Sequence, residues 1–148
     1  MGRNVITIEA QALAALPPAV SITHQHLLAC MNTLVRSGEL GRPLRILDVG
    51  CGNGELIAYI SAAFPMLQPG CELEIFGLDV ADSGVQADGF FARTLTMLRD
   101  RFPNVDWKRR LSLVTSRETW SYPDNHFDFI VSNQVLEHVA DHDLLFRE

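Results

Sequence analysis

The chain has 148 residues, of which 47% are hydrophobic and 20% charged, a composition typical of a single domain with a packed core. Its formal charge of −6 argues against nucleic acid as a partner, because nucleic acid binds to basic surfaces. No apolar run reaches the ~20 residues that a membrane-spanning helix needs, so no membrane span is expected.

The cysteines and the N-terminus favour a reducing compartment. Cys30, Cys51 and Cys71 are odd in number and show no paired spacing, which predicts neither a disulfide framework nor a zinc site. The N-terminus is a poor signal peptide, because Glu9 and Gln11 interrupt its weakly apolar stretch. We therefore expect a cytoplasmic location.

The first part of the chain, residues 1–40, is predicted to be a helical segment. Residues 5–16 predict a short helix, and apolar residues recur at helical spacing within residues 21–38. The second part, residues 41–148, alternates short apolar runs with helical patterns.

Four of these apolar runs predict strands, because they are short and lack helix caps. The predicted strands are residues 44–50, 71–80, 108–116 and 127–133. The predicted helices of this part are residues 54–64, 89–102 and a last one from residue 141 onward. Pro65 and Pro103 are expected to end the first two of them.

Strands that alternate with helices predict a parallel sheet with right-handed crossovers. The nearly unbroken apolar character of the strands agrees, because a parallel sheet is covered on both faces. The predicted fold is therefore α/β and doubly wound. Ligands of such sheets lie beyond the carboxyl ends of the strands, at the switch point of the strand order. The segment "DVGCGNG", residues 48–54, is expected there.

This segment has three glycines at alternate positions, Gly50, Gly52 and Gly54, preceded by Asp48. A tight turn alone could need them, or a ligand could lie against the bare backbone. A second acid, Asp79, ends the second predicted strand, where it could accept ribose hydroxyls or cap a helix. The two features together favour a nucleoside-type cofactor.

The spacing G-x-G-x-G, with Asp48 two residues before the first glycine, resembles the first motif of class I S-adenosylmethionine-dependent methyltransferases. The segment "YPDNHFDFIVSNQVLEHV" is similar to the fourth-strand region of their type 11 methyltransferase domain. The resemblance covers Leu44 to about Glu148. It implies a Rossmann-like fold with parallel strands in the order 3-2-1-4 and helices on both faces. Whole domains of this type have further C-terminal strands, so residues 41–148 are expected to be a truncated, cofactor-binding half.

The resemblance also implies roles for individual residues. The glycine loop would hold the methionine part of S-adenosyl-L-methionine, and Asp79 would bind its ribose. Ser116 stands where many members have an acid that bonds the adenine amine. The implied cofactor-binding residues are Asp48, Gly50, Cys51, Gly52, Gly54, Asp79, Val80, Ser116, Asn133 and Gln134.

The segment "QVLEH", residues 134–138, is expected to face the transferred methyl. His138 could act as a general base for a hydroxyl acceptor, or it could be a structural histidine at a helix start. Relatives with E-x-x-E-H here bind a divalent metal, but Gln134 replaces the first acid, so no metal is expected.

The predicted function is methyl transfer from S-adenosyl-L-methionine to a small-molecule or glycan-precursor acceptor. One alternative is a non-catalytic binding or dimerisation module with the same fold. A homodimer could then form through the exposed fourth strand, because an open apolar edge invites pairing. An NAD-dependent oxidoreductase is a third reading, which the glycine spacing disfavours.

Overall fold

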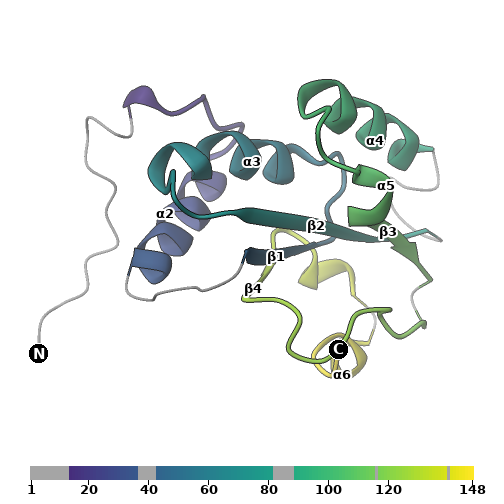
Figure 1. The fold of residues 1–148 in the computed structure, drawn as a ribbon. Helices are drawn as coiled ribbons and strands as arrows, with labels where there is room; N and C mark the ends of the chain where they lie inside the picture. The colour runs from purple at the N-terminus through teal and green to yellow at the C-terminus, as the bar shows by residue number, and fades with distance from the viewer. Residues whose placement is uncertain (1–13, 37–42, 82–88, 116, 140) are drawn as a thin grey trace, which may run out of the picture.

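The computed structural model describes residues 14–36, 43–81, 89–115, 117–139 and 141–148. Four parallel strands form one sheet in the order β3-β2-β1-β4 (Figure 1). The strands are β1 Leu44–Val49, β2 Leu73–Val80, β3 Leu111–Val114 and β4 Phe129–Ser132. The predicted strand order is therefore confirmed, and the order reverses between β1 and β4, where the glycine loop leaves β1.

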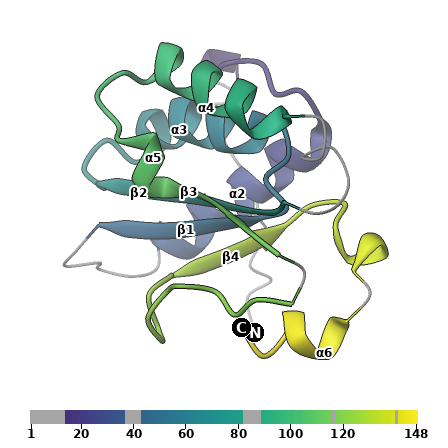
Figure 2. The same ribbon diagram turned by 90° about the vertical axis from the view of Figure 1, so that its right-hand side faces the viewer.

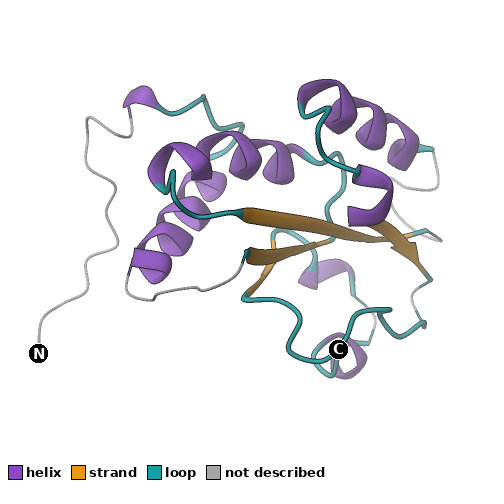
Figure 3. Cartoon of the chain, viewed as in Figure 1, coloured by secondary structure: helices purple, strands orange, loops and turns teal. Residues whose placement is uncertain are grey.

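Three longer helices lie on one face of this sheet (Figures 1 and 2). They are α2 Ile22–Arg36, α3 Glu55–Leu67 and α4 Phe90–Arg101. Short helical turns complete the chain, as Figure 3 shows: α5 Trp107–Arg110, η2 Leu136–His138 and α6 His142–Leu145. The helix α6 lies on the other side of the sheet, so helices are present on both faces.

The alternation of side chains along β1 divides the core into two clusters. Leu44 and Ile46 point toward the three long helices and join the larger cluster. Leu47 and Val49 point to the other face and form a smaller cluster with Leu78. Side chains from the segment before β4 and from α6 cover this smaller cluster, namely Trp120, Tyr122, Phe127 and Leu145. Both faces are therefore buried, as a parallel sheet requires.

Two predicted element boundaries were wrong. The helix expected to end before Pro65 continues to Leu67, with the proline inside its last turn. A proline there removes only one intrahelical bond, and the N–H of Gln68 donates to the Phe64 carbonyl at 2.9 Å to close the helix. Of the helix predicted over residues 5–16, residues 5–13 lie outside the described residues.

The third strand begins later than predicted, because residues 108–110 belong to α5 instead. Trp107 at the start of α5 is 1% exposed, and its indole N–H donates to the Phe102 carbonyl at 3.2 Å. Anchoring this large side chain in the core fixes a helical turn before Leu111. The sequence "KRR" alone gives no sign of that turn.

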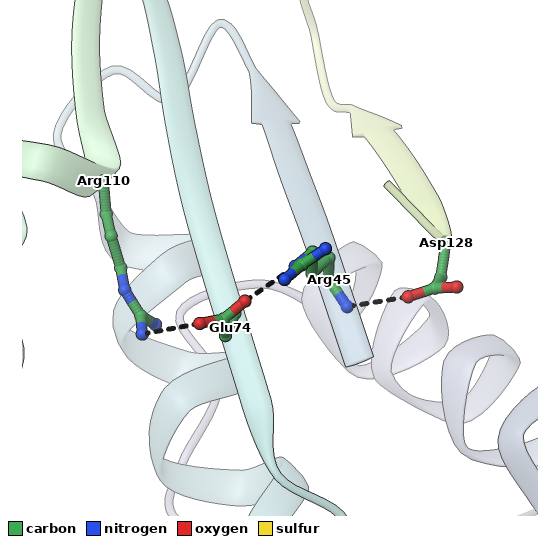
Figure 4. A network of polar contacts seen from close by, with 4 residues as sticks. All are labelled: Arg45, Glu74, Arg110 and Asp128. Carbon is green, nitrogen blue, oxygen red and sulfur yellow. Dashed lines mark hydrogen bonds and ion pairs between the residues drawn. The ribbon is translucent and has the colours of Figure 1, made fainter. Parts of the chain in front are cut away.

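A network of charged groups joins the amino ends of the strands, opposite the glycine loop (Figure 4). Glu74 on β2 pairs with Arg45 Nε at 2.7 Å and with Arg110 at 3.6 Å. The backbone N–H of Arg45 donates to the Asp128 carboxylate at 2.8 Å. These side chains are partly exposed, so each pair stabilises modestly. The network nonetheless fixes all four strands at one end and leaves the other end for a site.

Candidate cofactor-binding site

The glycine loop follows β1 and turns into α3. The N–H groups of Gly50 and Cys51 both donate to the Leu78 carbonyl, at 2.7 and 3.1 Å, which ties the loop to the end of β2. Gly54 donates to the Cys51 carbonyl at 2.8 Å and precedes the helix. Gly50, Gly52 and Gly54 have φ values of 75°, 50° and 75°. Left-handed backbone at alternate positions therefore accounts for part of the glycine pattern.

The three glycines differ in what surrounds them. A Cβ on Gly50 would lie 2.2 Å from Val135 Cγ2, and one on Gly54 would lie 2.7 Å from Thr94 Cγ2. Among the described residues, a Cβ on Gly52 would meet nothing nearer than the Gly50 carbonyl oxygen at 3.9 Å. Protein packing thus explains the first and third glycines. Of these three glycines, only Gly52 has no described side chain against its Cα.

Replacing Gly50 by alanine is expected to lower the free energy of unfolding by about 2–4 kcal/mol, from overlap with Val135 and from left-handed strain. The measurement is urea unfolding of Gly50→Ala, Val135→Ala and the double variant. Removing the Val135 methyls should relieve the overlap, so the double variant should be more stable than the two separate losses predict. Strict additivity would show that Gly50 and Val135 do not collide.

Asp48 has a buried carboxyl, which the packing of the fold does not explain. It lies in the centre of the sheet and is 2% exposed. Burial, and then the charge of Asp79, raise the pKa of its carboxyl from 3.8 to about 7. Within the described part of the chain, no Lys, Arg or His side chain forms an ion pair with it. A buried acid in this setting is suited to a cationic group of a ligand.

Asp79 connects the end of β2 to the glycine loop. Its Oδ2 accepts the Gly52 N–H at 2.8 Å, and its Oδ1 accepts the Val80 N–H at 2.8 Å. The carboxylate therefore holds the loop rather than capping a helix. Since each carboxylate oxygen has two lone pairs, these bonds are compatible with further donors from a ligand.

A cavity of about 510 Å³ opens at the carboxyl ends of β1, β2 and β3. Small-molecule sites in proteins usually have volumes of about 300–1,000 Å³. Four of the predicted site residues line this cavity, namely Gly50, Asp79, Val80 and His138. Other parts of its wall come from residues after β3, after β4 and in α6, among them Trp120, Val135 and Leu144.

The remaining predicted residues that the structure describes do not line this cavity, and Asp48, Gly52 and Gly54 are among them. The Cys51 side chain is buried in the larger core cluster, where burial raises the pKa of its thiol, and its sulfur packs toward Gly77. Asn133 and Gln134 follow β4 but do not line the cavity, and Gln134 has a left-handed φ of 58°. Ser116 lies outside the described residues.

His138 ends η2 with an exposed side chain at the cavity wall. Its backbone N–H donates to the Val135 carbonyl at 2.8 Å, which fixes the turn. A role as a base remains a prediction. No group of three His, Cys, Asp or Glu side chains that could hold a metal ion occurs among the residues that the structure describes.

The sequence reasoning missed two residues that shape the loop. Thr94 in α4 donates its hydroxyl proton to the Gly52 carbonyl at 3.0 Å. Val135, just after β4, packs where a Gly50 side chain would be. A threonine inside a helix and a valine in a loop carry no signal of such contacts, which only the tertiary structure creates.

Comparison with known proteins agrees with this arrangement. A family model described as a methyltransferase domain matches residues 22–148. The chain belongs to this methyltransferase family. Members of the family generally use S-adenosyl-L-methionine, so the family and the glycine loop point to the same class of ligand.

Several relatives are methyltransferases by name. A ubiquinone biosynthesis O-methyltransferase of Mesorhizobium japonicum is 32% identical over 112 residues, which cover 74% of this chain and 37% of the relative. A malonyl-[acyl-carrier protein] O-methyltransferase of Legionella pneumophila is 27% identical, over 72% of this chain and 31% of the relative. The chain thus spans about a third of the length of these methyltransferases.

Among solved structures, the CMeT domain of the citrinin polyketide synthase aligns with 21% identity and a TM-score of 0.49, over 76% of this chain and 27% of that chain. The described helices of the present chain include none that is long and apolar enough to cross a membrane.

Proposed function

We propose that this chain binds S-adenosyl-L-methionine at the glycine loop and takes part in methyl transfer to a small-molecule or glycan-precursor acceptor. One observation carries the proposal. No described side chain lies against the Gly52 Cα, while its N–H is held by the carboxylate of Asp79, a residue that lines the cavity. A turn without a ligand does not need this combination.

The residues present fit the parts of the cofactor. Asp79 at the cavity wall suits its ribose hydroxyls, and the loop backbone suits its carboxylate. The Asp48 carboxylate has the charge that suits its ammonium, although this side chain is 2% exposed and does not line the cavity. When bound, the cofactor supplies a methyl group on a sulfonium, which is already an activated leaving group. The protein then mainly has to align the acceptor with the methyl, an effect worth up to about 7–11 kcal/mol.

His138 is our candidate for accepting a proton from a hydroxyl acceptor, because its exposed side chain stands at the same cavity. We also propose a cytoplasmic location, which the three free thiols of the chain support.

A non-catalytic dimerisation module is a second candidate, and the edge strand β4 favours it. Among the described strands, β4 pairs only with β1 and lies at the edge of the sheet, and its Ile130 is 55% exposed. Sedimentation of the wild type and of Ile130→Lys tests this reading. A dimer that the lysine dissociates would support it, and a monomeric wild type would contradict it.

Calorimetric titration with S-adenosylhomocysteine and with NAD tests the main proposal. We expect heat of binding with the first ligand only. The glycines of the loop are spaced G-x-G-x-G, whereas dinucleotide-binding folds have the spacing G-x-G-x-x-G. Binding of NAD alone, or of neither ligand to the folded chain, would contradict the proposal.

Replacing Asp79 by alanine is expected to weaken S-adenosylhomocysteine binding by about 1.5–3 kcal/mol, because charge-assisted hydrogen bonds to the ribose are lost. The bonds to Gly52 and Val80 are lost as well, so the free energy of unfolding should fall by about 1–2 kcal/mol. Asp79→Asn keeps an acceptor oxygen and should retain more stability than alanine. An unchanged affinity together with a large loss of stability would give Asp79 a structural role only.

A further inference from the structure

One side chain connects α4 to the glycine loop. Thr94 is 2% exposed, and its hydroxyl donates to the Gly52 carbonyl at 3.0 Å across a separation of 42 residues. Two other helical threonines behave differently. Thr33 and Thr96 each donate to the carbonyl four residues earlier in their own helix, both at 2.9 Å. That back-bond is a common choice for a threonine inside a helix, so the Thr94 hydroxyl is used for a tertiary contact instead.

The peptide groups on both sides of the Gly52 Cα are held by side chains of different elements. The N–H donates to the Asp79 carboxylate at the end of β2 at 2.8 Å, and the carbonyl accepts from Thr94 in α4. Between these two bonds no atom of the described residues lies nearer than 3.9 Å to a Cβ added at the Gly52 Cα. The backbone of Gly52 is therefore held by two hydrogen bonds at a position without a side chain.

The methyl group of Thr94 makes a second contact with the same loop. It stands where a side chain on Gly54 would be, 2.7 Å from the position of an added Cβ. Gly54 is the last loop residue before α3, and it has a left-handed φ of 75°. One side chain thus constrains the loop at two of its three glycines, through a hydroxyl at one and a methyl at the other.

We propose that Thr94 is a positioning residue for the cofactor loop. Its hydroxyl fixes the peptide group after Gly52, so that the loop has its binding conformation before a ligand arrives. A preorganised loop loses less conformational freedom on binding, and this strengthens affinity without any direct contact to the ligand. The inference rests on the proposed function for its consequence in binding, but the loop contact itself can be tested without a ligand.

Three variants separate the hydroxyl from the methyl. Thr94→Val keeps the shape and removes the donor, whereas Thr94→Ser keeps the donor and removes the methyl. Thr96→Val removes a hydrogen bond of similar length in the same helix, away from the loop. Calorimetry should show S-adenosylhomocysteine binding weakened about 3- to 10-fold in Thr94→Val, the loss that one hydrogen bond accounts for. Thr94→Ser and Thr96→Val should bind as the wild type does. A folded Thr94→Val with wild-type affinity would overturn the proposal.

Amide hydrogen exchange of the chain without ligand provides the independent readout. The N–H groups of Gly52 and Gly54 should exchange faster in Thr94→Val than in the wild type. In Thr96→Val their exchange rates should equal those of the wild type. If the wild type binds no S-adenosylhomocysteine, the proposed function fails, while these exchange rates still decide the role of Thr94. If Thr94→Val does not fold, comparing Thr94→Ser with Thr94→Ala isolates the hydroxyl, because both lack the methyl. Equal protection of the loop in that pair would overturn the proposal.

Discussion

Replacing Asp48 by asparagine is expected to raise the free energy of unfolding above pH 7 by up to about 4 kcal/mol, although it removes a group of the candidate site. The folded chain raises the pKa of this buried carboxyl from 3.8 to about 7. Between these values the folded state holds a proton that the unfolded state has lost, so stability falls as pH rises from about 4 to 7. Above pH 7 the full penalty of the buried charge is present. Asparagine carries no charge and avoids it.

Urea unfolding of the wild type and of Asp48→Asn at pH 5 and pH 8 measures this effect. The advantage of the asparagine variant should be much larger at pH 8 than at pH 5. Asp106→Asn is the control, because Asp106 is largely exposed and only weakly paired with Arg109 at 3.5 Å. The same advantage at both pH values would show that the Asp48 carboxyl does not titrate in this range.

The same substitution should weaken S-adenosylhomocysteine binding, because the ligand ammonium loses its carboxylate. A gain of stability combined with a loss of affinity is the pattern expected of a group kept for function at a cost to the fold. A gain of stability without any change in affinity would separate Asp48 from the ligand.

Adding a single methyl at Gly52 is expected to weaken S-adenosylhomocysteine binding by about 10- to 100-fold, because the ligand would lie against the bare Cα. The domain should stay folded, since no atom of the part of the chain that the structure describes lies nearer than 3.9 Å to the new Cβ. Its left-handed φ of 50° should still cost about 1–2 kcal/mol of stability.

Gly89→Ala is the matched control for this experiment. Gly89 also has a left-handed φ, 72°, and an added Cβ there meets no described atom within 4 Å. It precedes α4 and lies outside the glycine loop and the cavity wall. The melting temperature should therefore fall by a similar amount in both variants. Only Gly52→Ala should bind S-adenosylhomocysteine more weakly. Retained affinity in a folded Gly52→Ala would make the loop an ordinary turn.

The fold could be predicted because its strands and turns have local patterns in the sequence. The run from Leu44 to Val49 is apolar enough to predict a central strand, and the glycines after it mark the turn into α3. Where prediction failed, a tertiary contact decided. Pro65 was expected to end α3, but the loss of one bond in a last turn is small beside the packing of the helix. Trp107 is buried at the start of α5, and this anchor holds the "KRR" segment that follows it in a helical turn.

Some residues of the site could be predicted from the sequence, and others could not. Gly52 and Asp79 could be found from spacing, because strand ends and glycine loops have fixed places in a parallel sheet. The reason for Gly50 could not, since it depends on Val135, 85 residues further along the chain. Nor could the deep burial of Asp48, which needs strands on both sides of β1. Contacts between distant segments leave no local pattern.

The positions of the two tryptophans allow their intrinsic fluorescence to report on two different events. Trp107 is 1% exposed in the larger core, whereas Trp120 stands at the cavity wall, with its backbone N–H bonded to the Glu148 carboxylate at 2.9 Å. Indole emission responds to the polarity around the ring, so the first ring would report unfolding and the second would report the filling of the cavity. In a Trp107→Phe variant all indole fluorescence would come from Trp120. A ligand in the cavity would then change the emission while the fold stays intact, without any attached dye.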